Sequence, residues 1–258
     1  LGPALAGVLL LISYTAPFYL FALGAFFVIL LITKQKSPPL SKSKDDLKKI
    51  SLFDNRVWPF LIVSASFGIC NAALVQTSSF YFQDVIDPNS TNFIALASVG
   101  FMLTALGILN GQLLIADRLQ TSPGSLIRLG ILFIFFSLIG VANSNSLVHI
   151  YISLFFYGLG GGMLGPGISA SLSLSVGKEN QGSASGFLGM VIPIGHVISP
   201  IISMPLYTIN PSYPYLLGSI LMLFCLFFVL INKRHKWIRK KNYRKDYKTY
   251  TEEPSDLP

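Results

Sequence analysis

One ionisable side chain stands deep inside an apolar stretch of the sequence, and it is the first candidate for chemistry. His196 lies within the apolar residues 183–208, and the middles of the apolar stretches contain no Asp, Glu, Lys or Arg. Ionisable groups in such surroundings are costly and usually functional. Because an imidazole titrates near neutral pH, His196 could exchange a proton or contact a substrate. The alternative is a neutral histidine that hydrogen-bonds to a neighbouring helix, and the sequence leaves both open.

Small and helix-bending residues surround His196 at alternating spacings of four and three. They are Gly182, Gly186, Gly189, Pro193, His196, Pro200 and Ser203. This spacing places them on one face of a helix. Glycine permits a close helix approach, and proline bends a helix and frees backbone carbonyls. We therefore predict packing and hinge roles for Gly186, Pro193 and Pro200, with His196 facing protein or a cavity.

A second group of small residues lies in the glycine-rich stretch 158–167. Gly161, Gly165, Ser169 and Ser173 recur every four residues, a spacing typical of tightly packed helices in membranes. Packing is the simpler interpretation of Gly161 and Gly165, and hinge bending is the alternative.

Uncharged polar residues in the apolar stretches are the candidates for contacting a small molecule. Asn71 and Gln76 lie in residues 58–82, and Tyr157 lies just before the glycine-rich stretch. Such side chains can bind a substrate or join two helices by hydrogen bonds. We predict a cavity lined by Asn71, Gln76, Tyr157 and His196.

Signs of an enzyme are weak. Ser185 precedes His196 by eleven residues, which is about 16 Å along a helix and beyond hydrogen-bond reach. The sequence contains no HExxH, CxxC or GxSxG, and no Gly-Lys-Ser/Thr follows the glycine-rich stretch. We predict no catalytic residues, no metal and no cofactor, with Cys70 and Cys225 as small core residues.

The elements that must position these residues are membrane-spanning helices. Of the 258 residues, 52% are hydrophobic and only 12% are charged, and the mean hydropathy is +0.61. This composition excludes a disordered chain and a disulfide scaffold. Because a span needs roughly 20 apolar residues, the sequence predicts an all-α, multi-pass bundle with seven full spans and a partial one in residues 1–14. The full spans are residues 17–33, 58–82, 93–116, 126–142, 148–176, 183–208 and 213–231.

The charges of the connecting segments predict the orientation. If the spans alternate sides, all 19 Lys and Arg residues fall on one side, which the positive-inside rule makes cytoplasmic. We therefore predict a multi-pass protein of the plasma (inner) membrane, with the linker 34–56 and the tail 233–258 in the cytoplasm. The basic residues lie next to the membrane, so anionic lipid is their expected partner and nucleic acid is not.

Four segments carry a resemblance to the major facilitator superfamily. Residues 1–7 contain Gly2 and Pro3 and resemble the end of the GPxxGG motif on helix five, departing from it at Ala6. Ala16-Pro17-Phe18 is similar to the opening of helix six. Asp117 and Arg118 resemble the Asp-Arg core of the loop between helices eight and nine. Residues 182–207 resemble the GxxxGPxxGxxLY pattern of helix eleven in drug exporters, with Ser199 and Ser203 in place of glycines.

This resemblance covers the chain to about residue 232 and implies its organisation. Residues 1–33 would end an N-terminal bundle, 34–56 would be the central cytoplasmic linker, and 57–232 would form the C-terminal six-helix bundle. The resemblance implies alternating-access transport of a small molecule, with proton-coupled export as in drug:proton antiporters. It implies that Asp117 and Arg118 form a gate or a helix-end charge pair. The partners would be the substrate, protons, the lipid bilayer and missing N-terminal helices of the same carrier. The alternative is a membrane fragment or scaffold without transport activity.

Overall fold

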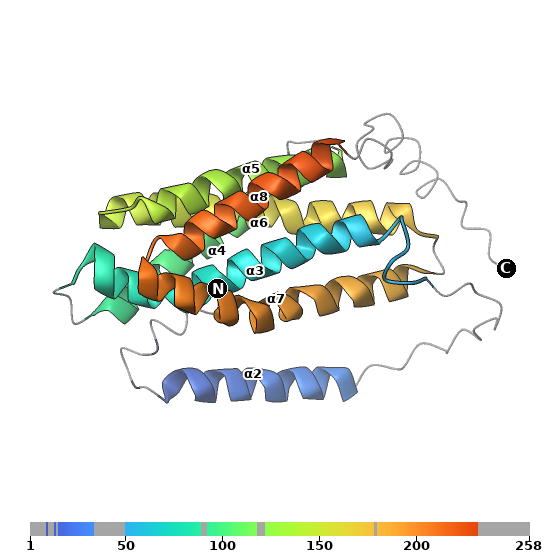
Figure 1. The fold of residues 1–258 in the computed structure, drawn as a ribbon. Helices are drawn as coiled ribbons and strands as arrows, with labels where there is room; N and C mark the ends of the chain where they lie inside the picture. The colour runs from blue at the N-terminus through green and yellow to red at the C-terminus, as the bar shows by residue number, and fades with distance from the viewer. Residues whose placement is uncertain are drawn as a thin grey trace.

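The computed structural model describes residues 9, 13, 15–33, 50–88, 92–117, 122–177 and 180–231. Every regular element within these ranges is a helix (Figure 1). The elements are α2 (Ala16–Thr33), α3 (Trp58–Tyr81), the short π-helix η1 (Phe82–Ile86), α4 (Phe93–Asp117), α5 (Pro123–Ala142), α6 (Leu147–Ser175), α7 (Gln181–Ile209) and α8 (Tyr213–Ile231).

The predicted all-α architecture with seven spans is confirmed. Seven helices are long and apolar enough to cross a membrane, and η1 extends the span of α3 to Ile86. Among the α-helices themselves, the largest disagreement is the start of α5, which begins three residues earlier than predicted. The Ser122 side chain caps this helix by accepting a hydrogen bond from the Ser125 N–H, and Pro123 occupies the first turn. Proline suits that position because its missing N–H has no partner there anyway.

The helices α3, α5 and α6 form the centre of the bundle. At least half of each of these spans is buried, whereas α4 and α7 are about one-fifth buried. α6 packs between α4 and α5, α7 packs on α3, and α8 lies against α5 and α3 (Figure 1). α2 lies apart from the six other long helices in this view, and Pro17 is its one buried residue among those described.

Glycines bring the backbones of neighbouring helices into direct contact. A Cβ on Gly158 or Gly162 of α6 would collide with the carbonyl oxygens of Thr104 and Ile108 in α4. On the opposite side of α6, a Cβ on Gly160 would lie 2.7 Å from the Gly130 carbonyl oxygen of α5. Glycine is therefore required at these positions for the helices to approach so closely.

A similar contact joins α7 to α3. A Cβ on Gly195 would lie 2.6 Å from the Gly68 carbonyl carbon, and one on Gly68 would lie 2.9 Å from the Ile192 carbonyl oxygen. The Ser199 hydroxyl donates to the Ile69 carbonyl oxygen at 3.1 Å, one turn further along α7. The buried face of α7 is thus the face of Gly195 and Ser199.

The glycines predicted to pack lie on open faces of the bundle. A Cβ on Gly161 would make only an ordinary contact of 3.5 Å with the Phe67 ring, and one on Gly165 or Gly186 would meet nothing within 4 Å. The physical reason is that Gly158 and Gly162 show the same four-residue spacing as Gly161 and Gly165, so the period alone does not identify the packed face. The predicted packing roles have no partner among the described helices and stay predictions.

Candidate functional site

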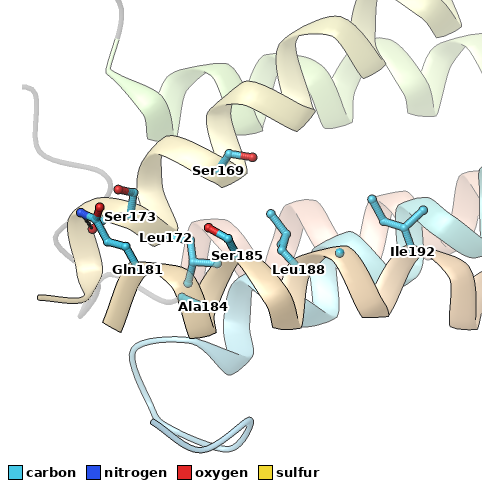
Figure 2. A pocket seen from close by; sticks show the side chains of 9 residues that line it. Ser169, Leu172, Ser173, Gln181, Ala184, Ser185, Leu188 and Ile192 are labelled. Atoms are coloured by element: carbon cyan, nitrogen blue, oxygen red, sulfur yellow. Dashed lines mark hydrogen bonds between the residues drawn. The ribbon is translucent and has the colours of Figure 1, made fainter. Parts of the chain in front are cut away.

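A cleft lined by both polar and apolar side chains opens between the end of α6 and the start of α7 (Figure 2). Its volume is about 260 Å³. We call it the serine cleft, and its lining residues are Ser169, Leu172, Ser173, Gln181, Ala184, Ser185, Leu188, Gly189 and Ile192. Because these two helix ends are consecutive in the chain, the cleft lies at the end of the bundle where α3, α5 and α7 begin.

Among the described residues, the polar groups that line the serine cleft are uncharged. Ser169 and Ser185 are exposed on facing helices, and each presents a hydroxyl that can donate and accept hydrogen bonds. The Gln181 side-chain amide donates to the Ser173 carbonyl oxygen at 3.5 Å, where the cleft narrows toward the α6–α7 connection (Figure 2). Leucine and isoleucine side chains form the remaining wall. This combination suits a neutral ligand with apolar and hydrogen-bonding parts.

A proline removes one backbone hydrogen bond of α7 beside the serine cleft. Pro193 lies inside α7 and has no N–H to donate to the carbonyl of Gly189, four residues earlier. Gly189 lines the cleft, and open space lies where its Cβ would be. Pro200 removes the corresponding hydrogen bond to the His196 carbonyl. Both predicted hinge prolines thus lie within a continuous helix.

The four residues predicted to line a cavity lie outside the serine cleft. Tyr157 is buried, and its ring stacks on Phe67 with the ring centroids 6.3 Å apart. The Tyr157 hydroxyl and the Gln76 amide oxygen are buried without a hydrogen-bond partner in the described part of the chain. Asn71 is half-buried. His196 is exposed, and its Nδ1 lies 3.3 Å from the carbonyl oxygen of Ile192 in the same helix.

Sequence reasoning missed the serine cleft although it singled out several of its residues. The spacing of Ser169 and Ser173 indicated helix packing, and the distance from Ser185 to His196 excluded Ser185 as a nucleophile. The available signal was the pair of hydroxyls one turn apart on α6, followed after a short connection by Ser185 on α7. That signal is weak because serine is equally suited to helix packing.

The remaining predicted site residues lie at the margins of the described structure. Asp117 ends α4, and its side chain, Arg118, Gly2 and Pro3 lie outside the described residues. No group of three or more His, Cys, Asp or Glu side chains within the described ranges is arranged to hold a metal ion.

Two basic residues fall within the described ranges, and both lie at the same end of the bundle as the serine cleft. Arg56 precedes α3, and Arg128 lies in the second turn of α5. The Arg56 guanidinium donates to Asp54 with an Nη2–Oδ2 distance of 2.9 Å, and this bonding lowers the pKa of the Asp54 carboxyl. We call this end the basic end of the bundle.

Cysteine labelling will test whether water reaches the serine cleft. Ser169 is exposed and lines the cleft, whereas Ser171 on the same helix is 1% exposed. We expect a water-soluble maleimide to label Ser169→Cys rapidly and Ser171→Cys slowly, because thiol reactivity requires access. Cys70 and Cys225 are buried and should give little background. The extent of labelling is measured by mass spectrometry. If Ser169→Cys is labelled as slowly as Ser171→Cys, the cleft is closed to water.

The seven long apolar helices and their glycine contacts define a multi-pass helical membrane protein. The sequence matches the model of the Major Facilitator Superfamily over residues 1–142 and again over residues 114–254. The chain therefore belongs to the Major Facilitator Superfamily, a family of membrane transporters.

The fold is similar to that of a solved transporter. This chain superposes on the in meso crystal structure of the POT family transporter PepTSo with a TM-score of 0.60 and a sequence identity of 17%. It covers 70% of this chain and 37% of that transporter, so this chain spans little more than a third of its length. At this identity the similarity concerns the fold alone. No curated protein matches the sequence.

Proposed function

We propose that this chain belongs to a carrier that moves a neutral small molecule across a membrane by alternating access. The observation that carries this proposal is the serine cleft, whose described lining combines uncharged polar and apolar side chains at one end of a transporter-family bundle. Its hydroxyls, the Gln181 amide and the apolar wall offer a neutral molecule both hydrogen bonds and apolar contact. Proton-driven export, as in the drug:proton antiporters, is the specific form that we propose, on the basis of the helix-eleven resemblance.

The proposed organisation places residues 57–232 as the C-terminal bundle of a longer carrier. Residues 1–33 would belong to the first bundle, 34–56 would link the two, and 233–258 would form the tail. Support comes from the open faces at Gly165 and Gly186 and from the low burial of α4 and α7. These faces would be covered by helices of the first bundle, which alternating access requires.

The proposed orientation places the basic end in the cytoplasm of a cell whose plasma or inner membrane holds the carrier. Arg56 and Arg128 support it, because cytoplasmic segments are enriched in Lys and Arg. In this orientation the serine cleft opens toward the cytoplasm. Asp117, which ends α4 at the same end, would form the gate or helix-end charge pair with Arg118.

The four residues predicted to line a cavity have a role in the proposal separate from the serine cleft. Polar atoms in a protein interior normally have a hydrogen-bond partner, and the Tyr157 hydroxyl and the Gln76 amide oxygen have none among the described residues. In the proposed mechanism a substrate or water supplies that partner part-way through transport. Asn71 and His196 would complete this second station, with His196 as the group able to carry a proton.

The test begins with the mass of the native gene product, purified from its own membrane. We expect a mass well above the 28.2 kDa of this chain. The purified carrier, reconstituted in liposomes, should then move a radiolabelled neutral probe such as chloramphenicol when a proton gradient is imposed. Collapse of the gradient by a protonophore should stop the movement.

Alternative outcomes separate the parts of the proposal. Movement that survives the protonophore contradicts proton coupling but supports transport. Absence of movement for a panel of neutral compounds, with a mass near that of this chain, supports the non-transporting fragment instead. Single alanine replacements of Asn71, Gln76, Tyr157 and His196 should each slow transport, and unchanged rates would remove the second station from the mechanism.

A further inference from the structure

A second cavity, which shares no residue with the serine cleft, opens between α7 and α8 over the middle of α3. Its volume is also about 260 Å³. Cys70 and Ala73 of α3 and Ser203 of α7 are buried and form its floor. Ile202 of α7 and Leu217 of α8 are each 41% exposed and border its mouth. We call it the α7–α8 groove.

The α7–α8 groove is apolar except for one unused hydrogen-bond donor. The Ser199 hydroxyl donates to the Ile69 carbonyl oxygen at 3.1 Å, and the Cys70 thiol donates to the Gly218 carbonyl oxygen at 3.5 Å. The Ser203 hydroxyl is 3% exposed and has no partner within the described residues. Because buried hydroxyls normally have partners, an occupant of the groove should carry an acceptor for Ser203.

The depth of Ser203 indicates what kind of acceptor is available. α7 has 29 residues and is therefore about 43 Å long, whereas the hydrocarbon core of a membrane is about 30 Å thick. A centred helix extends about 7 Å beyond each edge of the core. Ser203 lies six residues before the end of α7, or about 9 Å along the axis. Its hydroxyl is thus near the level at which acyl chains join their ester groups.

The surroundings of the groove indicate where its occupant comes from. Ile201 of α7 and Phe224 of α8 are 72% and 68% exposed, and both are apolar. In a membrane such surfaces face hydrocarbon. No charged side chain lines the groove, so a polar headgroup has no partner inside it. The molecules that reach the mouth are the acyl chains of neighbouring lipids.

We infer that the α7–α8 groove binds one acyl chain of a surrounding ester-linked phospholipid, with the Ser203 hydroxyl donating to the ester carbonyl. The apolar floor and walls receive the upper part of the chain. The ester oxygen gives Ser203 the partner that the described residues do not supply. This inference concerns the lipid-facing side of α7 and is independent of transport through the serine cleft.

Two phospholipids that differ only in the linkage provide the test. The 258-residue chain is reconstituted in bilayers with phosphatidylcholines that carry a photoreactive diazirine at the same carbon of an ester-linked or ether-linked chain. Crosslinked residues are identified by mass spectrometry. We expect crosslinks at Ile202 and Leu217 to be about fivefold stronger with the ester, a factor equivalent to one net hydrogen bond.

Substitutions in the groove separate the hydrogen bond from the cavity itself. Ser203→Ala should abolish the preference for the ester while leaving crosslinks at the exposed Phe224 unchanged. Ala73→Leu should fill the floor and reduce crosslinks at Ile202 and Leu217 with both lipids. Equal labelling by ester and ether in the unsubstituted chain overturns the role of Ser203. Labelling of Ile202 and Leu217 no stronger than that of Phe224 overturns the site.

Discussion

Replacing Gly158 by alanine is expected to destabilise the bundle by about 1–3 kcal/mol, the usual cost of overpacking a well-packed core. The new methyl group would collide with the carbonyl oxygen of Thr104. That atom belongs to the backbone of α4, so it cannot move aside as a flexible side chain would. The two helices must separate, and the contacts on both sides of the crossing are lost.

Gly165 on the same helix provides a matched control. A Cβ at this position meets nothing within 4 Å, so Gly165→Ala should stabilise α6 by up to about 1 kcal/mol through helix propensity. The measurement is unfolding of the purified chain in mixed micelles by added denaturing detergent, followed by circular dichroism. Effects of the same sign and size at both positions would contradict the backbone contact at Gly158.

Filling the serine cleft is expected to block transport by the intact carrier. Ser185→Trp places a large ring in a cleft of about 260 Å³. Transport should fall by about tenfold or more, a loss of at least roughly 1.4 kcal/mol of productive binding. The initial rate of probe movement in liposomes is the measurement, made on equal amounts of carrier that elute as a single species in size-exclusion chromatography.

Ile201→Trp, on the same helix, controls for the bulk of the new ring. Ile201 is 72% exposed and does not line the serine cleft, so its replacement should leave the rate near that of the unsubstituted carrier. A Ser185→Trp carrier that transports normally would exclude the cleft from the pathway. It would leave the station at Tyr157 and Gln76 as the remaining candidate.

The spans were predictable because hydropathy depends on composition over about 20 residues, not on contacts. The ends of the helices were less predictable. α5 begins at Pro123 because the Ser122 side chain caps it, and a hydropathy average over a window does not detect such a local hydrogen bond. Residues 183–208 were correctly predicted as one span in spite of their prolines, and α7 runs from Gln181 to Ile209. A membrane helix tolerates proline because neighbouring helices can satisfy the carbonyls that it frees.

The packed faces and the candidate site were less predictable for a common reason. On α6, Gly162 and Gly165 differ by less than one helical turn, yet a Cβ on Gly162 would collide with α4 and one on Gly165 would meet nothing within 4 Å. The four-residue spacing of small residues fits more than one face of the helix. Which of these faces is packed depends on where the neighbouring helices lie. The same ambiguity made Ser169 a packing residue in the sequence and a cleft residue in the structure. His196 was predicted to face protein or a cavity. It is exposed among the described helices, so this stays a prediction.

The glycine contacts also divide the bundle mechanically. Gly158, Gly160 and Gly162 join α4, α5 and α6 by backbone-to-backbone contact, and Gly68 and Gly195 join α3 to α7 in the same way. Close-packed interfaces of this kind have low compressibility. The three helices α4, α5 and α6 are therefore expected to move as one rigid body, a first plate, and α3 and α7 as a second plate. α6 and α7 contact each other little, and the serine cleft lies on the seam between the two plates. A small rotation along that seam would change the width of the cleft without separating any of these glycine contacts.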